Sequence, residues 1–209
     1  MYPYIKSKWF IKSAFLTLCL TLSSCTTLSS PSSKSSNNVQ KVDFLILTTS
    51  SINPDIINRA SPVRLDIFQL KTKDDFIYSS YADLISGDKD PNSGDSVSTQ
   101  HILKPDSIHA IPLELEQDVD YIGITIGYRE IEEATWKIVL QKQPNKWGDT
   151  YNYLYLKVAE DGISQLSKSQ MKAELSDYAK RHPDDERVTK NGNYKKPKYD
   201  YSKGIFNKE

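Results

Sequence analysis

The sequence has few of the residues on which catalytic and metal sites depend. It has only two cysteines and three histidines among its 209 residues. His101, His109 and His182 are scattered and do not show a metal-site spacing such as HExxH. No G-x-S-x-G motif and no P-loop is present. We therefore expect a binding or scaffold protein and not an enzyme, with no cofactor and no metal.

Excess charge and long apolar runs are also lacking. The formal net charge is zero, 38% of the residues are apolar and 26% are charged. This balance excludes a polybasic nucleic-acid-binding protein, a polytopic membrane protein and a fully disordered chain. The length suits one domain with appendages.

The N-terminal residues have the pattern of a secretory signal peptide. Lys6, Lys8 and Lys12 precede an apolar run from Ser13 to Leu22, which is too short to span a bilayer as a helix. The run ends in Leu22-Ser23-Ser24-Cys25, which resembles the bacterial lipobox. The resemblance implies that residues 1–24 are removed and that the thiol of Cys25 is lipidated. An ordinary secretory signal with a chance cysteine is the alternative.

The residues after Cys25 predict an anchor and a tether. Thr26 stands where an aspartate would retain a Gram-negative lipoprotein at the inner membrane, so we expect sorting to the outer membrane, with the domain facing the periplasm. Three acyl chains would hold the protein there permanently. Residues 25–40 comprise the lipidated cysteine and fifteen residues rich in serine and asparagine, which form a flexible tether with a reach of roughly 20 Å.

Residues 41–166 predict a mainly β domain. Seven apolar or alternating segments with short turns indicate a two-sheet β-sandwich; they are 42–48, 63–70, 97–103, 108–115, 121–128, 136–141 and 153–158. Pro112 places its strand at a sheet edge. Gly123 and Gly127 lie on one strand face, which indicates that another element packs closely there.

Two helices are predicted outside the strands. Asp74 and Asp75 favour a helix start, an apolar stripe follows, and Gly87 suits its end. A second helix is predicted from Ser169 to Arg181, ended by His182-Pro183. We take residues 167–209 as this helix and a basic tail, which we expect to be disordered after Pro183.

The segment from Ser50 to Pro62 is long for a connection between two strands. It carries Ile52, Ile56 and Ile57 among polar residues. Apolar side chains on a long loop indicate a contact surface. The alternative is a loop that folds back and buries its isoleucines on the sandwich edge.

Two other stretches offer weaker alternatives. Residues 88–94 (DKDPNSG) partly match a calcium loop, but the glycine is displaced by one position and Thr99 stands where a bidentate glutamate is needed. Tyr151, Tyr153 and Tyr155 alternate along a strand and could stack against a sugar. A periplasmic glycan- or small-ligand-binding lipoprotein is therefore the second hypothesis.

Several segments together are similar to the TssJ family, the outer-membrane lipoproteins of type VI secretion systems. The resemblance covers about residues 41–142 and the lipobox. Its segments are Asn53-Pro54, residues 61–71 (SPVRLDIFQLK), Phe76, Ala82-Asp83-Leu84, Leu103-Lys104-Pro105, residues 121–124 (YIGI), Arg129 and Trp136-Lys137.

The resemblance implies a transthyretin-like β-sandwich with one added helix and no catalysis. It also implies a partner, the periplasmic domain of the inner-membrane protein TssM, and through it TssL. The contact loop of the family corresponds to Asn53, Pro54, Asp55, Ile56, Ile57 and Asn58, with Arg59 beside them. The tail from residue 183 departs from the family pattern, so a peptidoglycan contact by the tail is a further expectation.

Overall fold

The computed structural model describes residues 40–86, 96–143 and 151–195. Several predictions lie outside these ranges. They concern the signal peptide (1–24), Cys25, the tether up to residue 39, the calcium-like stretch 88–94 and the tail beyond residue 195.

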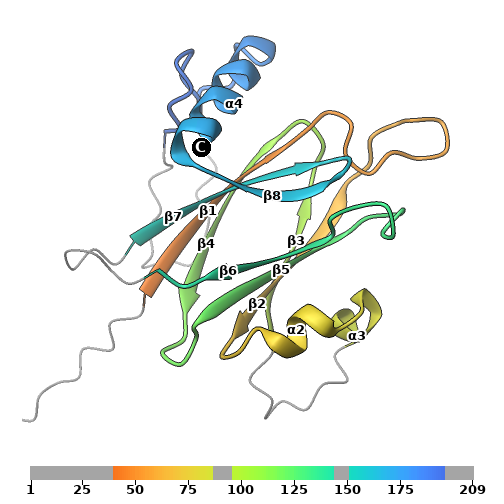
Figure 1. Cartoon of the computed structure of the whole chain (residues 1–209). Helices are drawn as coiled ribbons and strands as arrows, with labels where there is room; N and C mark the ends of the chain where they lie inside the picture. The colour runs from red at the N-terminus through yellow and green to blue at the C-terminus, as the bar shows by residue number, and fades with distance from the viewer. Residues whose placement is uncertain (1–39, 87–95, 144–150, 196–209) are drawn as a thin grey trace, which may run out of the picture. The chain divides into compact units, whose positions relative to one another are not determined.

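The described residues form two sheets of four strands each that pack face to face (Figure 1). One sheet has the order β4-β1-β7-β8 and the other has the order β3-β2-β5-β6. The predicted β-sandwich is therefore confirmed. The strands are β1 (Gln40–Thr48), β2 (Val63–Leu70), β3 (Ser96–Leu103), β4 (Ile108–Leu115), β5 (Tyr121–Gly127), β6 (Lys137–Gln141), β7 (Tyr151–Ala159) and β8 (Gly162–Leu166).

Strand β8 was not among the seven predicted strands. It has five residues, and only its first two, Gly162 and Ile163, are buried. A short strand without apolar alternation leaves little pattern to detect. It forms the edge of its sheet by pairing antiparallel with β7.

Strand β1 lies in the middle of its sheet, antiparallel to β4 and parallel to β7. Val42, Phe44 and Ile46 enter the core between the two sheets. Leu45 and Leu47 lie on the opposite face and are also buried, in a second cluster. A strand that is covered on both faces has a continuous apolar run, as residues 44–47 do. Pro112, on β4, stands at an edge of this sheet as predicted.

The helical region after β2 differs from the prediction. Instead of one helix there are two short ones, α2 (Asp74–Tyr78) and α3 (Tyr81–Ile85). Ser79 and Ser80 have extended ψ angles of 145° and 166°, which break the helix. Ser80 then begins α3 through a capping box, in which its hydroxyl accepts from the Asp83 N–H and the Asp83 carboxylate accepts from the Ser80 N–H. Because Ser80 must be extended to form this capping box, a continuous helix cannot pass through it. The prediction of a single helix was therefore wrong.

The two glycines of β5 allow these helices to lie directly on the sheet. A Cβ at Gly123 would lie 2.7 Å from the Phe76 ring, and a Cβ at Gly127 would overlap the Tyr81 hydroxyl. Phe76 is fully buried and packs against Phe68 with their ring centroids 5.3 Å apart. The predicted close approach at this face is therefore confirmed.

Helix α4 (Lys168–Arg181) covers the outer face of the sheet that contains β1 (Figure 1). The predicted helix is confirmed, with Met171, Leu175 and Tyr178 buried on one side and His182 at its C-terminus. Among the helices in the described ranges, none has both the length and the hydropathy needed to cross a bilayer.

The segment after Pro183 is folded as far as residue 195, so the prediction of disorder is wrong for this part. Asp185 accepts hydrogen bonds from the Tyr178 hydroxyl and the Arg187 guanidinium. Val188 is buried and forms a β-bridge with Tyr194. The polar composition that suggested disorder did not reveal this, because the segment is held by contacts with α4 and with the buried cluster beneath it, against which Val188 and Tyr194 pack.

Two histidines face the interior next to the hairpin between β3 and β4. His101 pairs with Leu65 on β2, and His109 pairs with Ile46 on β1. Burial lowers the pKa of both imidazoles from the ordinary value of 6.5. The neutral ring of His109 accepts a hydrogen bond at Nε2 from the Lys104 N–H, 3.2 Å away. The fold therefore favours the uncharged form of both rings.

These two histidines predict an acid-sensitive stability. Because their pKa values are lower in the folded state, their contribution is complete above about pH 6.5 and is lost as the pH falls. We expect the free energy of unfolding, measured with urea, to decrease from about pH 7.5 to about pH 5.5. The variant His101→Leu/His109→Gln should have a flatter profile. An equally steep profile in this variant would assign the effect to other groups.

Candidate functional site

The connection between β1 and β2 forms one end of the sandwich. Ile52 is fully buried and its carbonyl accepts a hydrogen bond from the Ser61 N–H. Ile56 is fully exposed and Ile57 is 62% exposed. The loop therefore combines the two predicted alternatives, an exposed apolar surface and isoleucines buried at the sandwich edge. One isoleucine anchors the base of the loop, and the other two are presented to solvent.

The tip of the loop is organised around Asp55. Its backbone N–H donates to the Arg59 carbonyl, and its carbonyl accepts from the Asn58 N–H. One carboxylate oxygen accepts from the N–H groups of Ile57 and Arg59, and the other accepts from the Arg59 guanidinium at 2.8 Å. These hydrogen bonds, led by the one from the Arg59 backbone, lower the pKa of Asp55. The loop is therefore a closed turn that holds Ile56 and Ile57 outward.

Two asparagines with positive φ give the loop its course. Asn53 has a φ of 47° and Asn58 a φ of 59°, a region that asparagine tolerates better than most residues. The Asn53 side chain is buried, donates to the Pro62 carbonyl and accepts from the Arg129 N–H at 2.8 Å. Asn53 thereby joins both ends of the loop to the β5–β6 connection.

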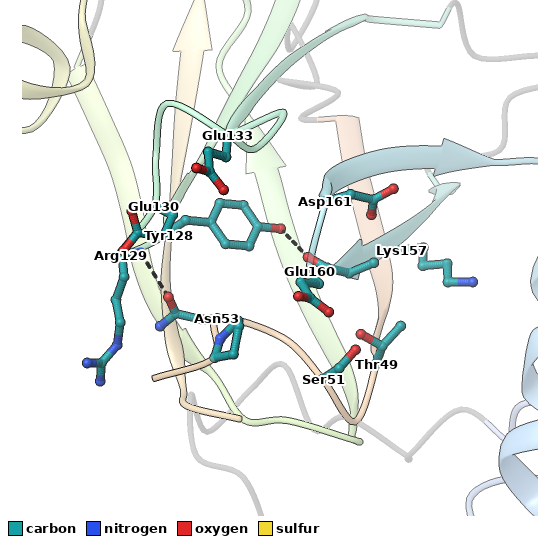
Figure 2. Close-up of a pocket in the computed structure, with 12 residues that line it drawn as sticks. Thr49, Ser51, Asn53, Tyr128, Arg129, Glu130, Glu133, Lys157, Glu160 and Asp161 are labelled. Atoms are coloured by element: carbon teal, nitrogen blue, oxygen red, sulfur yellow. Dashed lines mark hydrogen bonds between the residues drawn. The ribbon is translucent and has the colours of Figure 1, made fainter. Parts of the chain in front are cut away.

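A pocket of about 540 Å³ lies beside this loop. Figure 2 shows its lining, which comes from three connections at the same end of the sandwich, residues 49–54, 128–133 and 157–161. The Tyr128 hydroxyl donates to the Ala159 carbonyl at 2.8 Å, which joins two of these connections. Burial, and secondarily the charge of Asp161, raises the pKa of Tyr128, so this hydroxyl stays protonated as a donor.

The pocket is predominantly acidic. Four carboxylates line it, from Glu130, Glu133, Glu160 and Asp161. Two basic residues also line it, Lys157 and Arg129. Lys157 forms an ion pair with Glu174 at 2.6 Å, and the Arg129 guanidinium donates to the Ser61 hydroxyl. No sequence motif indicated this pocket, because its residues come from three segments far apart in the chain.

The described residues offer a surface for binding. Within them, no group of three or more His, Cys, Asp or Glu side chains is placed to hold a metal ion. Tyr155, one of the three alternating tyrosines, is half-buried and packs against the cluster under α4. The loop residues predicted as a contact site, Asn53 to Arg59, are brought together at one end of the sandwich. Of these, Ile56 and Ile57 supply the exposed apolar surface.

Comparison with known proteins gives one family and a set of similar structures. Residues 40–176 match the family model of the type VI secretion lipoproteins, described by the members VasD, EvfM and TssJ. No curated protein sequence matches the chain significantly.

The similar solved structures include three from type VI secretion systems. The lipoprotein TssJ1 of Pseudomonas aeruginosa is 22% identical, with a TM-score of 0.56 over 62% of this chain and 97% of that one. The membrane-bound component Lip of Serratia marcescens is 15% identical, with a TM-score of 0.56 over 62% and 98% of the two chains. A chain of a type VI membrane complex is 22% identical, with a TM-score of 0.53 over 62% and 99%. At these identities the likeness establishes the fold.

Proposed function

This chain belongs to the TssJ family of type VI secretion lipoproteins, and we propose that it is a lipid-anchored outer-membrane scaffold that binds the periplasmic domain of TssM. The contact surface is the β1–β2 loop, residues Asn53 to Arg59. The role needs no catalytic group, and through TssM the protein is connected to TssL.

The exposed isoleucine pair is the observation that carries this proposal. Large apolar side chains that remain in solvent on a rigid support are typical of an interface awaiting its partner. The turn around Asp55 already holds Ile56 and Ile57 in place, so binding requires little further ordering of the loop. Family membership supports the identity of the partner.

The proposed anchor complements this surface. After removal of residues 1–24, acylated Cys25 and the segment 25–40 tether the domain to the outer membrane. The tether meets the domain at Gln40, the first residue of β1, whereas the loop follows the last residue of the same strand. Confinement at the membrane raises the effective concentration of the domain near its partner, so a modest loop interface is sufficient. The contact of the tail with peptidoglycan stays a prediction.

Calorimetry tests the proposal directly. The mature chain with Cys25→Ser, which receives no lipid, is titrated into the periplasmic domain of TssM from the same host. We expect binding, and we expect it to disappear when residues 53–58 are replaced by glycine and serine. Binding that survives the replacement would move the interface elsewhere. Failure of the intact chain to bind would contradict the proposed partner.

A further inference from the structure

A second pocket lies on the outer face of the β1 sheet, away from the β1–β2 loop. It has a volume of about 280 Å³ and lies between α4, the middle of β1 and the segment that follows α4. It is lined by Leu45, Tyr155, Lys168, Met171, Lys172, Leu175, Gly192, Asn193 and Tyr194. None of these lining residues belongs to the proposed contact surface for TssM.

The base of this pocket is apolar. Leu45, Met171 and Leu175 are buried there, and the half-buried rings of Tyr155 and Tyr194 pack against the same cluster. Methionine adapts its shape to a neighbouring group and makes favourable contacts with aromatic rings. The pocket therefore suits one large aliphatic or aromatic side chain.

The rim of the pocket is basic. Lys168 and Lys172 are exposed, lie four residues apart on α4 and line the pocket together. The two acids of α4 do not neutralise them, because Glu174 pairs with Lys157 and Asp177 pairs with Lys180. Within the described ranges no ion pair is formed by either rim lysine. The rim therefore attracts negative charge.

The outer wall is held rigidly against α4. Gly192 has a φ of 70°, and a Cβ there would overlap the Lys172 carbonyl, so only glycine allows this approach. The Ser176 hydroxyl donates to the Lys190 carbonyl at 3.0 Å, and the Thr189 N–H donates to the Asn193 carbonyl. The wall residues 192–194 lie outside the 40–176 family match, so this chain's C-terminal extension completes the pocket.

We propose that this pocket is a second docking site, which binds an acidic peptide segment of another protein. One large apolar side chain of the peptide enters the pocket, and neighbouring carboxylates pair with Lys168 and Lys172. The positive charges of Lys168 and Lys172 favour a partner with negative charge. Because the pocket is walled by residues 192–194, it can enclose a single side chain, which a flat membrane surface does not offer. The floor residue Leu45 lies in mid-strand on the outer sheet face, so both docking sites can be occupied at once. The scaffold would then join two partners.

The test uses the mature Cys25→Ser chain and a fluorescein-labelled peptide of sequence EDLFDE. We expect saturable binding by fluorescence anisotropy, with NMR shift changes centred on residues 168–175 and 192–194. Lys168→Glu/Lys172→Glu should weaken the affinity about tenfold or more. The variant Lys73→Glu/Lys142→Glu makes the same change of net charge on other elements and should bind normally.

Several outcomes would overturn the proposal. These are no peptide binding, equal weakening by both charge-reversed variants, or shift changes that lie elsewhere. Binding to vesicles of phosphatidylglycerol without binding to the peptide would assign the rim to a lipid surface. Self-association in sedimentation that disappears in Lys168→Glu/Lys172→Glu would assign the pocket to a second copy. None of these results bears on the TssM contact, which is tested by the loop replacement.

Discussion

Replacing both exposed isoleucines of the β1–β2 loop, as Ile56→Asp/Ile57→Asp, is expected to abolish binding to the TssM periplasmic domain. Apolar side chains at the centre of an interface contribute about 2 kcal/mol or more each, so the loss of both should lower the affinity by about 1000-fold or more. The new carboxylates would also lose their hydration on binding. Calorimetry of the mature Cys25→Ser variant measures the loss.

The fold should survive this change. Ile56 is fully exposed, and the side-chain hydrogen bonds that close the turn come from Asp55. We expect the midpoint of urea unfolding to be unchanged. Ile77→Asp is the matched control, since Ile77 is 40% exposed on α2, which follows the end of β2 opposite to the loop. Equal losses of affinity in both variants, or none in the loop variant, would contradict the assignment of the site.

The second large effect concerns stability. Arg64 and Asp66 lie two residues apart on β2 and form a bidentate ion pair, with the guanidinium Nε 2.7 Å from a carboxylate oxygen. The hydrogen bonds to Asp66 raise the pKa of Arg64. The Asp66 side chain is fully buried. Arg64→Met would leave the buried carboxylate of Asp66 without its ion-pair partner. We therefore expect the free energy of unfolding to fall by about 3–5 kcal/mol.

Urea unfolding followed by tryptophan fluorescence measures this effect. The double variant Arg64→Met/Asp66→Leu should regain most of the loss, because it removes the stranded charge. Lys71→Met breaks an ion pair with Asp118 in which both side chains are more than half exposed, and it should cost about 1 kcal/mol or less. If Arg64→Met is no worse than Lys71→Met, the buried carboxylate is not the determinant.

Sequence patterns predicted seven of the eight described strands, because each of the seven is either an apolar run, as β1 is, or an alternating segment. The approach of an element to Gly123 and Gly127 and the edge position of Pro112 were also readable from residue type. The break at Ser79-Ser80 was not, since a capping box and a continuous helix share the same apolar spacing. The segment from Pro183 to residue 195 is folded because it contacts α4, and a local sequence pattern does not reveal such contacts.

The candidate site was predictable to a different degree. Loop length and the apolar residues in it pointed to residues 53–59. Which isoleucines face solvent was not readable, because it depends on the hydrogen bonds of Asn53 and Asp55 to distant or backbone groups. The acidic pocket and the pocket under α4 arise where the fold gathers separate segments, so they needed the structure.

The central position of β1 has a mechanical consequence. In the proposed arrangement the tether pulls at Gln40 and the partner holds the loop after Thr48, so tension runs along this one strand. Its nine residues span about 30 Å. The hydrogen bonds to β4 and β7 lie across the pulling direction. They are loaded together, in shear, and cannot open one after another. A pull between the outer membrane and TssM would therefore be resisted by all the hydrogen bonds of this strand at once.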